Sequence, residues 1–115
     1  MTEPLAARKY AGAISALRHA ILETPGITLP ATRRMAEAGI PTGTLADPWL
    51  DLVRNASPRL TDGHVDELRA AGIVDDEILE LTLAASFGEA ARRLRRGLDA
   101  VADTSDAVDS QIEER

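Results

Sequence analysis

The sequence predicts an all-α protein, a small bundle of about five helices. Three observations support this class. Apolar residues make up 44% of the chain but aromatic residues only 3%, so the core must be built from Leu, Ile, Val and Ala, a composition that favours helix packing over a β-sandwich. Apolar residues recur at helical spacing in five segments. Proline and glycine stand at the boundaries of these segments, where helices commonly begin and end.

The first two predicted helices have clear boundaries. Residues 5–22 are expected to form a core helix, and Pro25-Gly26 follow its end. Its apolar stripe consists of Tyr10, Ile14, Leu17 and Ile21. The second helix, residues 30–38, opens on a proline that suits the first helical turn and closes at Gly39.

The next two predicted helices are marked by their caps. Asp47 precedes Pro48, a pairing that predicts an N-cap followed by proline at the first helical position. This third helix should stop before Pro58. Thr61 is the expected cap of the fourth helix. Gly72 is its expected end, because glycine carries no Cβ that would oppose a left-handed conformation.

The fifth helix is predicted to run from about residue 75 to residue 101 and has two apolar stripes. The stripe expected to contact the core consists of Leu79, Leu83, Phe87, Leu94, Leu98 and Val101. A second stripe, on the opposite side of the first half, consists of Ile78, Leu81, Ala85 and Gly88. Because four short helices need not cover both faces, we expect this second stripe to be the interface of a homo-oligomer, with Gly88 permitting a close helix approach. The alternative is that the first and third helices cover it within one subunit.

Charge divides the chain into one helical domain, residues 1–101, and an acidic segment, residues 102–115. The net charge is −6, and the acidic segment carries five acids against one base. Since the segment has few apolar side chains, we expect it to be disordered or a fraying helix and dispensable for folding. No secretory leader or long apolar span is evident, so a cytoplasmic protein without membrane contact is expected.

A series of short motifs fills residues 60–94. In order these are Leu60-Thr61-Asp62, the run from Val65 to Ile73, the acidic run from Asp75 to Leu81, Ala85, Phe87-Gly88 and Arg93-Leu94. In this order they resemble the C-terminal region of the alkylhydroperoxidase D and carboxymuconolactone decarboxylase superfamily. The resemblance implies an all-helical, alkylhydroperoxidase D-like fold that assembles as dimers, trimers or hexamers. Val74 departs from the pattern, which often has Ser or Thr as the cap there, so Asp75 is expected to cap instead.

The same resemblance assigns no catalytic residue to this chain. Peroxidase members of the superfamily carry a Glu, a Cys-x-x-Cys pair and a nearby His, and nothing in residues 1–60 matches that arrangement. The chain contains no cysteine, and a thiol peroxidase requires a thiolate. The sequence therefore excludes thiol peroxidase chemistry, and no cofactor or metal is expected.

Three side chains are candidates for acid or base chemistry: Glu80, His64 and His19. Glu80 projects beside the apolar face of the fifth helix, where partial burial would raise its pKa, although helix-start electrostatics is the simpler explanation. His64 lies in the first turn of the fourth helix and His19 beside the stripe of the first. Neither has a partner three or four residues away that would form a metal pair. Surface or helix-end positions are expected for both histidines.

A basic cluster in the fifth helix consists of Arg92, Arg93, Arg95 and Arg96. It is a candidate contact for an anionic ligand, an acidic partner surface or nucleic-acid phosphates. Glu89 and Asp99 stand three or four residues from members of the cluster, so the face is partly paired within the helix. The chain is acidic, and no aromatic residue interleaves with the cluster. We therefore disfavour nucleic acid and expect a solvated or intersubunit salt-bridged face.

Two functions remain from the sequence. The favoured one is a non-redox helical module that binds a small molecule or assembles with copies of itself. The alternative is a thiol-independent enzyme of the decarboxylase or isomerase type, with acid and base drawn from Glu80, His64 or His19. The enzyme requires two of these groups to converge on one closed pocket, whereas the module requires only apolar contacts between subunits.

Overall fold

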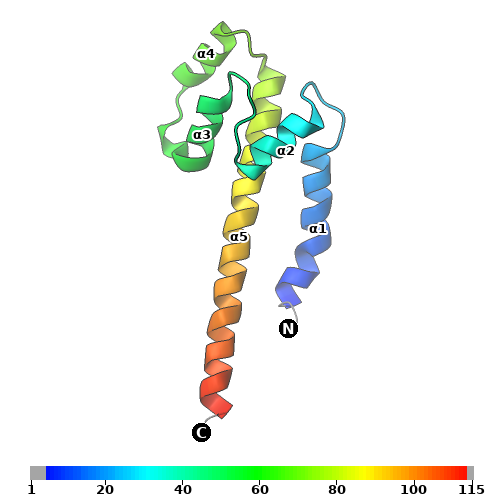
Figure 1. Ribbon diagram of the computed structural model, residues 1–115, viewed down its shortest axis with the longest axis vertical. Coiled ribbons are helices and arrows are strands. Elements are labelled where there is room, and N and C mark those ends of the chain that lie inside the picture. Colours follow the sequence, from blue (N-terminus) through cyan, green and yellow to red (C-terminus); the bar gives the residue numbers. More distant parts are fainter. Residues whose placement is uncertain (1–4, 114–115) are drawn as a thin grey trace.

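The computed structural model describes the backbone of residues 5–113 and the side chains of residue 8 and residues 10–104. Within that range the chain forms five α-helices, one short 3-10 helix and no strand, which confirms the all-α class (Figure 1). In chain order the elements are α1 (Leu5–Leu22), α2 (Pro30–Ala38), α3 (Asp47–Asn55), η1 (Ser57–Arg59), α4 (Asp62–Ala70) and α5 (Asp75–Glu113).

Local sequence determines most helix boundaries. The predicted ends at Gly39 and Gly72 are confirmed, and both glycines adopt positive φ angles, +77° and +92°, which side chains with a Cβ rarely tolerate. Thr61 is the N-cap of α4, as predicted. The predicted cap of α3 is wrong by one residue, because Ala46 is the N-cap and Asp47 is already helical. The Asp47 carboxylate instead accepts hydrogen bonds from the backbone N–H groups of Thr42 and Gly43, each at 3.0 Å.

Helix α5 is longer than the predicted end near Val101. It continues without interruption from Asp75 to Glu113 and contains 39 residues, which corresponds to a length of about 58 Å. The acidic segment, residues 102–115, therefore begins inside this helix. Its side chains beyond Thr104 lie outside the described part of the chain.

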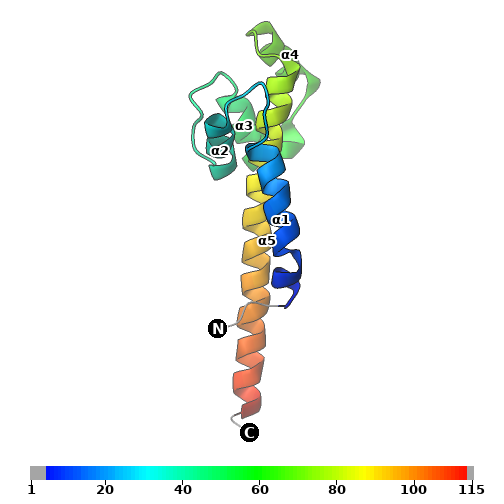
Figure 2. The ribbon, with the colours of Figure 1, turned by 90° about the vertical axis from the view of Figure 1, so that its right-hand side faces the viewer.

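The core lies at one end of α5. Helices α2, α3 and α4 gather around the first part of α5, and we call this end of the molecule the head (Figure 1). The rest of α5 extends away from the head, with α1 running beside part of it in the opposite direction (Figure 2). The buried apolar residues are Leu22, Ala36, Ala46, Leu50, Val53, Leu68, Ile73, Ile78, Leu81, Ala84 and Ala85.

One charged side chain is buried with this core. The guanidinium group of Arg33 donates hydrogen bonds to the carbonyl oxygens of Ile21, Thr24 and Thr28 at 3.0, 2.8 and 3.3 Å. These carbonyls belong to the end of α1 and the loop that follows it, where backbone acceptors lack helical partners. Arg33 therefore joins the end of α1 to α2.

The overall shape is elongated. The molecule measures 66 × 30 × 20 Å with a radius of gyration of 18.4 Å, whereas a compact domain of this length has a radius of about 13 Å. Its accessible surface is 7916 Å², roughly 1,800 Å² more than the roughly 6,100 Å² typical of a compact monomer of this mass. None of the helices in the described range combines the length and apolar character needed to cross a membrane.

Candidate functional site

The stripe predicted to form an oligomer interface lies inside the chain. Ile78, Leu81 and Ala85 are all buried in the core, and Gly88 is buried as well. Their assignment to the oligomer interface is therefore wrong. This half of α5 is instead covered within one subunit. Helices α1 and α3 pack on α5, as the alternative predicted, but the most extensive contact is made by α2, which the alternative did not include.

Gly88 lies where α5 and α2 approach each other closely. A Cβ atom at this position would lie 2.8 Å from the carbonyl carbon of Glu37 and 3.0 Å from its Cα, and closer still to its carbonyl oxygen. Arg92, one turn further along α5, donates from Nη1 to the same Glu37 oxygen at 2.7 Å. The prediction that Gly88 permits a close helix approach is thus confirmed, although the neighbour is a helix of the same chain.

The stripe predicted to contact the core is instead largely exposed. The exposed fractions of Leu79, Leu83, Leu94 and Val101 are 57%, 47%, 48% and 62%, while Phe87 and Leu98 are half-buried. These six residues constitute the exposed α5 stripe: Leu79, Leu83, Phe87, Leu94, Leu98 and Val101. The face of α5 predicted to be internal is therefore its outer face.

Helix α1 is exposed over most of its length, and only Ile14 and Ile21 of its predicted stripe are half-buried. Tyr10 and Leu17, predicted to lie in the core, are both more than half exposed. Burial is concentrated at the end of the helix, where Leu22 is fully buried and Ile21 packs against the core. Apolar surface is thus exposed on both of the helices that extend away from the head, and such surface is typical of an interaction site.

Glu80 holds a loop in place. Its carboxylate accepts hydrogen bonds from the backbone N–H groups of Ile27 and Thr28 at 2.9 and 3.0 Å and from the Thr28 hydroxyl at 2.6 Å. Burial disfavours the charged carboxylate, but these hydrogen bonds and the positive charge of Arg33 outweigh it, so the pKa of Glu80 lies below its ordinary value. The expected rise in pKa is therefore wrong, and Glu80 remains an anion that secures the loop before α2.

The two histidines occupy helix ends. His64 Nδ1 accepts a hydrogen bond from the Thr61 backbone N–H at 3.0 Å, which forms half of a capping box at the start of α4. His19 is exposed in the last turn of α1. The predicted surface or helix-end positions are confirmed.

The basic cluster of α5 is partly neutralised by Glu89. This carboxylate lies 3.0 Å from Arg92, 3.4 Å from Arg93 and 3.9 Å from Arg96. Arg92 also donates to the Glu37 carbonyl oxygen at the end of α2, where the helix dipole favours a positive charge. Arg92 thus has a structural role, whereas the side chains of Arg93 and Arg96 are 66% and 71% exposed.

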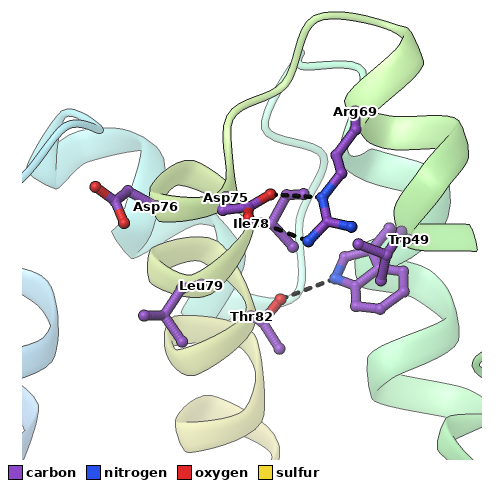
Figure 3. A pocket seen from close by; sticks show the side chains of 8 residues that line it. Trp49, Arg69, Asp75, Asp76, Ile78, Leu79 and Thr82 are labelled. Carbon is purple, nitrogen blue, oxygen red and sulfur yellow. Dashed lines mark hydrogen bonds and ion pairs between the residues drawn. The ribbon is translucent and has the colours of Figure 1, made fainter. Parts of the chain in front are cut away.

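A hollow beside Trp49 has a volume of about 350 Å³ (Figure 3). Trp49 Nε1 donates to Thr82 Oγ1 at 2.8 Å, and Arg69 bonds to both oxygens of Asp75 at 2.7 and 3.1 Å. A smaller hollow of about 230 Å³ is lined by His64 among others. Neither hollow is lined by two of the three acid or base candidates, as the enzyme alternative would require.

Comparison of the chain with protein-family models, curated proteins and solved structures finds no match. The resemblance of residues 60–94 to the alkylhydroperoxidase D superfamily accordingly stays a prediction. Among the described residues, the exposed α5 stripe is the feature that points to a function.

Proposed function

We propose that this protein is a non-redox helical module that assembles with further copies of itself. The observation that carries the proposal is the exposed α5 stripe, where four large aliphatic side chains are about half or more exposed along a single helix face. Soluble monomers seldom expose contiguous apolar surface of this extent, and association removes it from water. The oligomeric assembly implied by the superfamily resemblance is consistent with this function.

The surface area of the chain supports the same function. The excess over a compact monomer of this mass, roughly 1,800 Å², exceeds the roughly 800 Å² that each partner buries in an interface of standard size. Self-association is favoured over a foreign partner because soluble assemblies are most often closed, symmetric homo-oligomers. The proposed interface comprises the exposed α5 stripe. Tyr10 and Leu17 of α1 are also more than half exposed and add apolar surface available to a second copy.

Light scattering at micromolar concentration tests the proposal. The wild type should be an oligomer, whereas the double variant Leu83→Gln/Leu94→Gln should be a monomer with unchanged helical circular dichroism. The matched control is Arg96→Gln/Asp99→Gln, which adds the same amides at exposed positions on the opposite face of α5 and leaves the net charge unchanged. The control should keep the wild-type mass. A folded wild-type monomer under these conditions would refute the proposed function.

A further inference from the structure

We infer that a second copy of this chain packs across α1 and α5 together, so that four helices, two from each copy, enclose one apolar interface. This inference rests on the proposed self-association and adds α1 to the surface that associates. It follows from the contacts that orient α1 and α5, from the lack of charge on the surface that they share and from the exposure of α1 within its own chain.

Contacts with α2 orient both helices. The Arg18 guanidinium of α1 forms an ion pair with the Glu37 carboxylate, with 2.7 Å between Nε and Oε2. Arg92 of α5 donates to the backbone carbonyl oxygen of the same residue at 2.7 Å. Arg18 and Arg92 therefore both point toward the end of α2, which lies on one side of α1 and α5 (Figure 2). Because they reach the same residue, the two arginines lie at about the same level along these helices.

On α1, Leu17 faces away from α2. Successive residues of an α-helix are about 100° apart around its axis, so Leu17 is about 100° from Arg18. Ile14 and Ile21 lie between them in angle. These two isoleucines are half-buried, and Ile21 packs against the core, so they mark the side of α1 that faces its own chain. Arg18 borders that side toward α2, and Leu17 borders it opposite α2, where 52% of Leu17 is exposed.

On α5, the exposed α5 stripe also faces away from α2. Leu94 is about 160° from Arg92 around the helix axis, and Arg92 points toward α2. Because Leu17 is next to Arg18, which lies level with Arg92, Leu17 also lies level with this part of the stripe. Leu17 and the exposed α5 stripe thus belong to one surface, which we call the shared outer face.

The shared outer face is uncharged over its middle part. On α5, between residues 83 and 101, the residues within about 60° of Leu94 are Leu83, Phe87, Ala90, Ala91, Gly97, Leu98 and Val101. On α1, the residues one turn from Leu17 are Ala13, Ile14, Ala20 and Ile21. An ionic partner finds no counter-charge on such a face. The same face of a second copy is equally apolar, and a twofold axis brings two identical faces together.

Within one chain, α1 has little support. Between residues 10 and 20, every residue except Ile14 is exposed, although helices in proteins draw most of their stability from packing along one face. A second copy on the shared outer face supplies that packing. The surplus surface of roughly 1,800 Å² also suffices for both extended helices, because each partner in a standard interface buries roughly 800 Å².

Hydrogen exchange at two protein concentrations tests the inference on the unmodified chain. Where light scattering shows the oligomer, the amides of residues 10–20 should exchange with deuterium about tenfold more slowly than after dilution to the monomer, because the second copy holds α1 in place. Amides of α5 near Leu94 should show the same dependence on concentration. These α5 amides are the internal control, since they report association along the stripe whether or not α1 takes part.

Two neighbouring positions of α1 provide matched variants. Leu17→Gln should raise the dissociation constant at least about tenfold, because a twofold pair loses the burial of two leucine side chains. Ala16→Gln places the same amide at an exposed position about 160° from Ile14, on the side of α1 turned away from its own chain, and should leave the dissociation constant unchanged. Both variants should keep the helical circular dichroism of the wild type, since both positions are exposed.

The outcomes separate this inference from the proposed function. An oligomer whose α1 amides exchange at a rate independent of concentration would overturn the inference while self-association stands. Equal dissociation constants for the two variants would do the same. If Leu17→Gln failed to fold, hydrogen exchange of the wild type alone would decide the inference. A wild type that stays monomeric would overturn the proposed function and the inference together.

Discussion

Replacing Gly88 by alanine should destabilise the fold, although alanine is the better helix former. The added Cβ would lie 2.8 Å from the Glu37 carbonyl carbon, so α2 would have to move away from α5. Overpacking of this kind costs about 1–3 kcal/mol, and strain on the bond from Arg92 to the Glu37 oxygen adds about 1.5 kcal/mol. The gain in helix propensity offsets about 1 kcal/mol. The free energy of unfolding should therefore fall by about 2–3 kcal/mol.

Gly12→Ala is the matched control for this substitution. Gly12 also lies in a helix interior, and a Cβ there would have no heavy atom within 4 Å, so the propensity gain should raise stability by up to about 1 kcal/mol. Thermal unfolding followed by circular dichroism should show a Tm about 10 °C lower for Gly88→Ala and slightly higher for Gly12→Ala. If both variants gained stability to the same extent, the close crossing of α2 over α5 would be refuted.

Two further substitutions probe burial and charge. Ala85→Arg should prevent folding, because it places a charge in the core. Leu83→Arg, on the exposed stripe, should leave the circular dichroism spectrum of the monomer unchanged. A folded Ala85→Arg protein would contradict the assignment of Ala85 to the buried face of α5. Glu80 has a lowered pKa in the folded chain, so its stabilisation is complete above the unfolded-state pKa and is lost as pH falls through the folded-state value. Urea unfolding should therefore show the wild type losing more stability than Glu80→Gln between about pH 5 and pH 3, and equal losses would mean that the carboxylate does not secure the loop.

Helix positions were predictable from the sequence because their signals are local. Pro30, Gly39, Thr61 and Gly72 act within one helical turn, and the helix boundaries at these positions are confirmed. The cap at Asp47 was misplaced by one residue, since its carboxylate bonds backward to the preceding loop rather than forward into the helix.

The buried face of α5 could not be predicted from apolar spacing, because both faces carry an apolar stripe. The face with the larger side chains, such as Leu83 and Leu94, was expected to be internal. Short helices that cross at close range instead select the face with small residues, Ala84, Ala85 and Gly88, which allows the backbones to approach. Which face is covered thus depends on contacts between segments distant in the sequence.

The role of Glu80 depends on such a distant contact. Its hydrogen-bond partners at Ile27 and Thr28 lie more than fifty residues earlier in the chain, and no local motif connects the two segments. Its position beside an apolar face suggests acid or base chemistry. In the structure, however, the Glu80 carboxylate accepts three hydrogen bonds from the loop before α2.

The contact between Glu80 and the loop before α2 also affects the dynamics of that loop. Ile27 is largely exposed to solvent, yet its amide is bonded to a side chain anchored on α5. Hydrogen exchange at the Ile27 and Thr28 amides therefore requires the loop to detach from Glu80. These two surface amides should exchange with deuterium more slowly than their exposure alone would suggest.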